Sequence, residues 1–196
     1  MGSVGTGFSM SLDGFIAEPD DSVERLFRWY TLGEATHEIP SGGGAIKMNA
    51  AGAEFVQEAS KVIGALVTGR RQFDMTHGWG GRHPLDAPIV VVSHHPAPGW
   101  VEPDWPIIFV QDGVPSAIAQ AQALAGEKTV AVSSASIAQQ CLNAGLLDEI
   151  HIDLVPILLG QGIRLFEHLT VGVIELESTG VTDATGVTHL TYRILK

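Results

Sequence analysis

Two patterns alternate along the chain: short runs of consecutive apolar residues, and longer amphipathic stretches. The short runs predict β-strands, and the amphipathic stretches predict helices. The expected strands are 3–12, 62–68, 89–92, 107–110, 129–132 and 149–155. The expected helices are one that starts at 20–22 and continues through 23–30, and others over 49–60, 114–125 and 135–144. Strands that alternate with helices predict an α/β fold with a central, mixed but mostly parallel sheet.

The strands and the connections between them define the layers of this fold. The runs Ile89–Val92 and Ile107–Val110 are apolar at every position, which predicts a sheet with helices on both faces. The end of the chain predicts an antiparallel hairpin that turns near Asp183–Gly186. Segment 31–47, with its proline and glycine run, is expected to be a mobile loop, and 76–87 another loop. No repeat or linker interrupts the chain, so we expect one domain over residues 1–196.

Composition narrows the class of protein. Hydrophobic residues make up 45% of the chain and charged residues 17%, which predicts a folded domain. The net charge of −11 disfavours binding to nucleic acid, although a local basic pocket can still hold a phosphate. No apolar run approaches the roughly 18 residues of a membrane span, and the first residues do not resemble a signal peptide. With Cys141 as the single cysteine, we expect a cytoplasmic protein.

Three segments carry a resemblance to a known family. They are SLDGFIA at 11–17, GRRQFD at 69–74, and GLLDEIHIDLVPILLGQGIRLF at 145–166. In this order and spacing they resemble the dihydrofolate-reductase-like superfamily, and within it the reductase half of the bacterial riboflavin-biosynthesis deaminase–reductase. The resemblance implies a three-layer fold and hydride transfer from NADPH. A single cysteine cannot supply the Cys-x-x-Cys of a deaminase zinc site, so only the reductase half is expected.

The first candidate cofactor segment follows a strand directly. Gly69 allows the backbone to approach a ligand closely, and Arg70 or Arg71 can form paired hydrogen bonds to phosphate oxygens. In the resembling family this segment holds the pyrophosphate side of NADPH, and Arg70 is the preferred candidate. The alternative is a glycine at a strand end followed by two solvated arginines.

The next strand ends in Ser93-His94-His95. In the resembling family the equivalent strand end meets the 2′-phosphate of the adenine ribose, so Ser93 and His94 are cofactor candidates. The alternative is an exposed loop. Adjacent histidines on an extended chain point in opposite directions, and we expect no metal site.

Ser133 and Ser134 stand where members of the resembling family commonly have two glycines joined by a cis peptide bond. Either the serines keep this bend and contact the cofactor phosphates, with Ala135 and Ser136 at the helix start, or the cofactor pocket is degenerate. Serine is also a favoured residue for capping a helix. The same strand–helix position exposes unpaired N–H groups to which an anion can bind.

The remaining candidates lie near the N-terminus. The resemblance places the nicotinamide against backbone groups of Met10, Ser11 and Ile16. The proton that accompanies hydride transfer needs a donor, for which Asp13 and Glu24 are the candidate acids. Asp13-Gly14 is also a common turn pair, and Glu24 is alternatively a solvated helix residue.

Together these features predict an NADPH-dependent reductase of a small, flat nitrogen heterocycle, a pterin or an aminopyrimidine. The resemblance is to the 5-amino-6-(5-phosphoribosylamino)uracil reductase of riboflavin biosynthesis. The alternative is a binding or scaffold protein with a reductase fold and no functional cofactor pocket. We expect no membrane partner. We also expect a homodimer, because the edge of the terminal hairpin would otherwise be open to unwanted pairing, and related reductases often pair there.

Overall fold

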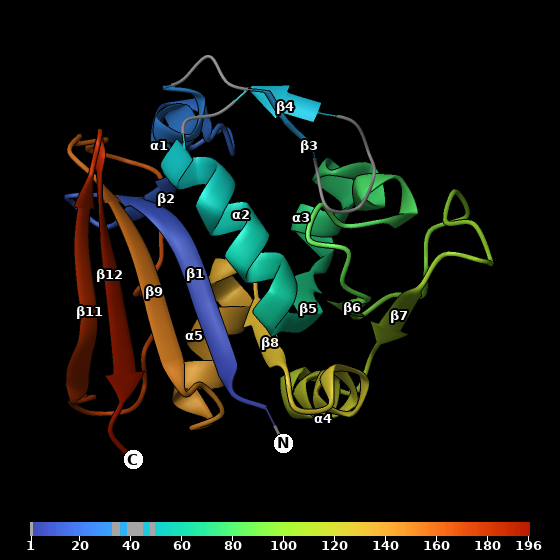
Figure 1. The fold of residues 1–196 in the computed structure, drawn as a ribbon. Helices are drawn as coiled ribbons and strands as arrows, with labels where there is room; N and C mark the ends of the chain where they lie inside the picture. The colour runs from blue at the N-terminus through green and yellow to red at the C-terminus, as the bar shows by residue number, and fades with distance from the viewer. Residues whose placement is uncertain (1, 33–35, 39–44, 48–49) are drawn as a thin grey trace.

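A central eight-stranded sheet organises the protein (Figure 1). The computed structural model describes residues 2–32, 36–38, 45–47 and 50–196. The strand order is β11-β12-β9-β1-β8-β5-β6-β7, and the six strands from β9 to β7 are parallel, whereas β12 and β11 are antiparallel. The strands of this sheet are β1 (Val4–Ser11), β5 (Ile63–Gly69), β6 (Ile89–Val92), β7 (Ile107–Val110), β8 (Thr129–Val132), β9 (Glu149–Val155), β11 (Leu176–Ala184) and β12 (Val187–Ile194). The mixed, mostly parallel sheet and its terminal hairpin confirm the predicted fold class.

Helices cover both faces of the sheet and complete a three-layer arrangement (Figure 1). One face carries α1, α2, α3 and the short 3-10 helix η1, and the other carries α4 and α5. The helices are α1 (Glu24–Phe27), η1 (Arg28–Thr31), α2 (Ala50–Val62), α3 (Arg70–Met75), the 3-10 turn η2 (His77–Gly81), α4 (Val114–Ala125) and α5 (Ala135–Asn143). No helix among the described residues is both long and apolar enough to cross a bilayer.

Alternation along each strand divides the core between the two faces. Val67 of β5 and Val90 of β6 belong to the cluster that packs under α4 and α5. The neighbouring Leu66 and Val91 point the other way, into a cluster with Phe73 of α3. Because successive strand residues face opposite sides of a sheet, the continuous apolar runs serve both layers.

The first helix is shorter than predicted. In place of one helix over 23–30, α1 ends at Phe27 and the tighter η1 follows. Leu26 and Trp29 are both buried and lie three residues apart. Helix positions three residues apart lie on the same side, so Leu26 at the end of α1 and Trp29 in η1 both face the core.

Two further expectations are corrected by the structure, and one small sheet is an addition to them. The described part of 31–47 contains a small antiparallel pair, β3 (Thr36–Glu38) and β4 (Ala45–Lys47), instead of a loop alone; Pro40 and 42–44 lie outside the described residues. A second small sheet, β2 (Phe15–Ala17) with β10 (Ile163–Arg164), was not predicted. The strand β7 is at the edge of the sheet, so Ile108 is 36% exposed instead of covered on both faces.

Candidate functional site

Two strand–helix junctions meet at the carboxyl ends of the parallel strands. β5 and β8 are hydrogen-bonded neighbours, so the turn from β5 into α3 lies beside the turn from β8 into α5. The Gly69 N–H donates to the Ser134 hydroxyl at 2.7 Å, and the Ser133 N–H donates to the Val67 carbonyl at 2.9 Å. The structure therefore brings together the two segments proposed from the sequence for phosphate binding.

Gln72 gathers the hydroxyl groups of this junction. Its Oε1 accepts hydrogen bonds from Thr68 at 2.8 Å, from Ser134 at 2.9 Å and from Ser133 at 3.2 Å. Thr68 and Gln72 were not identified from the sequence. Thr68 and Gln72 meet the two serines only because β5 pairs with β8, which lies far from it along the chain. In the sequence, only the GRRQFD segment indicated this region.

Ser134 occupies the N-cap position of α5 but does not cap it. Its side chain makes no hydrogen bond to the N–H groups of α5 and turns toward β5 instead. The first N–H groups of α5, at Ala135, Ser136 and Ile137, therefore have no side-chain cap from Ser134. All peptide bonds in the described residues are trans, including the bond between Ser133 and Ser134.

Both candidate arginines are already paired. The Arg70 Nε donates to both carboxylate oxygens of Asp74 at 2.8 and 2.9 Å, and its Nη1 donates to the Pro96 carbonyl at 3.1 Å. Arg71 donates to Asp21 at 2.5 Å while most of its side chain stays in solvent. Both arginines follow the last residue of β5. A phosphate bound there would compete with Asp74 and Asp21 for their guanidinium groups.

Ser93 closes a tight turn at the end of β6. Its buried hydroxyl donates to the His95 carbonyl at 2.8 Å and accepts the His95 N–H at 3.0 Å. The hydroxyl is thus engaged within its own turn, whereas the side chains of His94 and His95 are exposed. Of this segment, the two histidines are the groups that remain available to a ligand.

Asp13 has a structural environment unsuited to the proton-donor role. Its carboxylate accepts hydrogen bonds from the Ser11 hydroxyl at 2.6 Å, the Gly160 N–H at 2.7 Å and the Leu159 N–H at 3.1 Å. These bonds, that of Ser11 foremost, lower the pKa of Asp13 to about 2. The group stays ionised near neutral pH and fastens the loop after β9 to the turn after β1.

Glu24 is likewise unsuited to donate a proton. It is exposed at the start of α1, and the hydrogen bond from the Ser22 hydroxyl lowers its pKa. Met10 and Ile16 are half-buried and pack against the larger core cluster. Ser11 is fully buried, and its oxygen accepts the Phe15 N–H at 3.0 Å, so it shapes the turn beside the expected nicotinamide position.

A polar row that the sequence did not identify crosses the sheet close to this turn. Ser9 of β1, Asp153 of β9 and His189 of β12 are register neighbours on the face that carries η1. The His189 Nδ1 and the Asp153 Oδ1 lie 2.7 Å apart. The alternation of polar Glu149, His151 and Asp153 along β9 could have placed these side chains on one face, although it could not have identified their partners.

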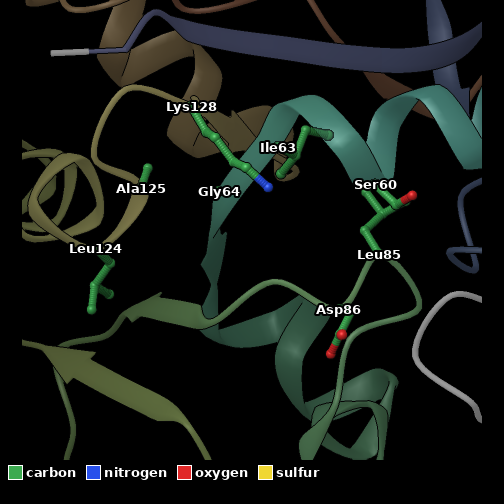
Figure 2. Close-up of a pocket in the computed structure, with 8 residues that line it drawn as sticks. All are labelled: Ser60, Ile63, Gly64, Leu85, Asp86, Leu124, Ala125 and Lys128. Carbon is green, nitrogen blue, oxygen red and sulfur yellow. The ribbon is translucent and has the colours of Figure 1, made fainter.

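The larger surface hollow lies elsewhere. A hollow of about 470 Å³ lies at the beginning of β5. Ile63 and Gly64 are among the residues that line it (Figure 2). Gly69, at the site described above, is the last residue of the same strand, and none of the predicted site residues lines this hollow. A smaller hollow of about 260 Å³ beside the terminal hairpin also contains none of them. The candidate site is therefore defined by the strand ends and not by either of these hollows.

Comparison with known proteins agrees with the fold. The family described as the RibD C-terminal domain matches residues 3–190. Among curated proteins, none matches the chain. A putative riboflavin biosynthesis protein from Shewanella sp. PV-4 has a TM-score of 0.73 at 21% identity, with 99% of each chain covered.

Two other solved structures share the fold at lower identity. A diaminohydroxyphosphoribosylaminopyrimidine deaminase/5-amino-6-(5-phosphoribosylamino)uracil reductase from Thermotoga maritima has a TM-score of 0.64 at 12% identity, and the match covers 99% of this chain but 57% of that one. Dihydrofolate reductase from Enterococcus faecalis, complexed with NADP(H) and RAB-propyl, has a TM-score of 0.58 at 16% identity, with 99% and 97% covered. At these identities the similarity establishes the fold.

Proposed function

Because the chain belongs to the RibD C-terminal domain family, we propose that it is an oxidoreductase that transfers a hydride from NADPH to a small nitrogen heterocycle of the pterin or aminopyrimidine type. The observation that carries the proposal is the meeting of the β5–α3 and β8–α5 junctions. Gly69 and Ser134 lie in hydrogen-bond contact there, and the first N–H groups of α5 are not capped by Ser134. Uncapped N–H groups at a helix start favour a phosphate.

The remaining cofactor contacts follow from the order of the strands. If the pyrophosphate binds at the two junctions, His94 and His95, which are exposed after β6, would hold the adenine ribose. The turn formed by Ser11 and Asp13 after β1, on the other side of the junctions, would hold the nicotinamide. Hydride transfer needs the ring placed against its acceptor and shielded from water. The turn after β1 is fixed by the buried Ser11, whose hydroxyl donates to Asp13.

We expect NADPH to stabilise the protein more than NADH does, because the 2′-phosphate adds charge near Arg70 and the histidines after β6. A cofactor at about one hundred times its Kd stabilises the native state by about 2.7 kcal/mol, or roughly 5–11 °C in Tm for a chain of this size. Replacing Arg70 by alanine should remove about 1.5–3 kcal/mol of NADPH affinity. Arg193→Ala, in β12 and paired with Glu177, is the matched control. Equal Tm shifts with NADPH and NADH would contradict the assignment.

A second candidate function is a binding or scaffold role without NADPH. The observation that favours it is the closed hydroxyl cluster, because the Ser134 hydroxyl already accepts the Gly69 N–H that a phosphate would otherwise receive. The same thermal measurement separates the two functions. Absence of any Tm shift at millimolar NADPH would favour the scaffold role.

We further propose that the protein forms a homodimer through β11. This edge strand is exposed along most of its length, and Val181 is 64% exposed. An uncovered edge offers N–H and C=O groups to a second copy. Light scattering at micromolar concentration should give twice the 20.8 kDa of one chain, and Val181→Lys should shift it toward the monomer. Val173→Lys, at an exposed position before β11, should leave the dimer intact; a single-chain mass for the unmodified protein would refute the proposal.

A further inference from the structure

The polar row on the sheet contains a paired acid and imidazole that none of the roles described above uses. Asp153 is buried at 7% exposure, and its Oδ1 lies 2.7 Å from the Nδ1 of His189. An imidazole whose Nδ1–H donates to a carboxylate has a fixed orientation and presents Nε2 outward. The geometry is that of an oriented acid–base group, in contrast to the exposed His94 and His95.

Aromatic residues of η1 form the inner wall around this pair. The Trp29 Nε1–H donates to the Ser9 hydroxyl at 3.0 Å, and the Trp29 ring lies edge-on to His189 with centroids 5.2 Å apart. Tyr30 stacks on Trp29 at 3.8 Å. Burial raises the pKa of Asp153, although His189 opposes this shift, and burial together with the nearby Asp153 charge raises the pKa of Tyr30. In the described residues, the titratable groups that act on Asp153 are His189 and His151, and Tyr30 lies across from it on η1.

Two atoms of the pair remain available. Within the described part of the chain, no hydrogen bond is made by the Asp153 Oδ2 or the His189 Nε2. The His189 side chain is 24% exposed. A carboxylate acceptor and an imidazole nitrogen, which donates when the ring is protonated, thus lie side by side on this face of the sheet. Gly7, one row further along β1, is exposed and presents bare backbone beside them.

The pair lies within reach of the proposed cofactor position. Ser9 is two residues before Ser11, the last residue of β1, and Asp153 is two residues before Val155, the last residue of β9. At about 3.3 Å per strand residue, the row lies roughly 7 Å from the turn where the nicotinamide is placed. A flat ring lying on the sheet between Ser9 and this turn would span the distance.

We propose that His189, held in place by Asp153, is the acid that protonates the heterocycle, and that the Asp153 Oδ2 binds an amino group of the same ring. This assignment rests on the proposed reductase function. It fills the proton-donor role for which Asp13 and Glu24 are unsuited.

The step balances with the groups named. The hydride of NADPH adds to the carbon of a ring C=N bond, and the π electron pair moves to the nitrogen. That nitrogen would take the Nε2 proton of the His189 imidazolium, which becomes a neutral imidazole, so NADPH becomes NADP⁺ and the substrate gains one hydride and one proton. The neutral imidazole regains its proton from water at its exposed edge, while Asp153 keeps the ring oriented.

The test uses the whole chain with and without saturating NADP⁺, and 2,4-diaminopyrimidine as the probe. Nitrogen NMR of ¹⁵N-labelled histidine rings should show a shift of the His189 Nε2 signal on titration, while the signal of the exposed His168 stays constant. With a ¹⁵N-labelled probe, the NMR signal of the ring nitrogen should shift, in the complex, to the value of the protonated ring. His189→Gln and Asp153→Asn should each weaken probe binding at least tenfold, whereas His168→Gln and Asp183→Asn should stay within twofold.

The outcomes separate this inference from the proposed function. NADPH affinity should remain within twofold of wild type in all four variants, because none of the four residues is assigned to the cofactor. If the wild-type protein itself does not bind NADPH, that result counts against the reductase proposal alone. The roles proposed for His189 and Asp153 are overturned if the probe does not shift the His189 signal or binds without becoming protonated. They are also overturned if the probe binds the Asp153→Asn variant as tightly as it binds the wild-type protein. The NMR titration needs no substitution, so it decides the matter even if a variant fails to fold.

Discussion

Replacement of Gly162 by alanine is expected to lower the free energy of unfolding by about 2–4 kcal/mol. Gly162 has φ +146°, and a Cβ there would lie 2.1 Å from the Ala17 carbonyl oxygen. The obstacle is backbone, not a flexible side chain, so β10 must move away from β2 to make room. Pairing of Ile163 with Ala17 is what joins these two strands.

Chemical denaturation measures this effect directly. In a thermal scan, the Tm should be lower by roughly 4–16 °C for a chain of this length. The matched control is Gly172→Ala, because a Cβ at Gly172 meets no atom within 4 Å and the residue has no positive φ. That substitution should stay within about 0.5 kcal/mol of wild type. Equal free energies of unfolding for the two variants would show that β10 can move away from β2 without loss of stability.

Replacement of Phe73 by alanine should cost about 3–5 kcal/mol, the range for removing a buried aromatic ring from a packed core. Phe73 has no solvent exposure. Its ring stacks on Trp100 with centroids 5.3 Å apart and meets Phe109 edge-on at 5.2 Å. Gly78 also packs against it, since a Cβ at that glycine would lie 2.9 Å from the ring.

The same substitution should weaken NADPH binding, because Phe73 anchors the short α3 that carries Arg70 and Gln72. Urea denaturation and cofactor titration of one preparation measure both effects. Met75→Ala is the control on the same helix, since Met75 is 55% exposed. We expect this control to change the free energy of unfolding by less than about 0.5 kcal/mol. A Phe73 variant as stable as the Met75 variant would mean that α3 is held by other contacts.

The proton donor shows where reasoning from residue type alone fails. Asp13 and Glu24 were chosen because a carboxyl group near the N-terminal loop suits the reaction. Their hydrogen bonds lower the pKa of each, so both carboxyl groups favour the ionised form. Solvation and hydrogen bonding decide whether a carboxyl group can hold a proton, and both are tertiary properties.

Several features followed from the sequence by itself. The bounds of β8 and β9 agree with the predicted strands, because an apolar run bounded by polar residues is a local property. The positions of Gly69 and of Ser133-Ser134 at strand–helix junctions were predicted in the same way. The family resemblance, carried by three short segments, was confirmed over residues 3–190.

Only the tertiary structure decided the contacts between distant segments. Gln72 meets Ser134 across 62 residues, His189 meets Asp153 across 36, and β10 pairs with β2 through strands of two and three residues. Strands so short carry no periodicity that a pattern could detect. The order of hydrophobic residues along the chain determined which helices and strands form. Strand register and burial determined which polar groups meet. Register and burial depend on residues that come together only when the sheet is complete.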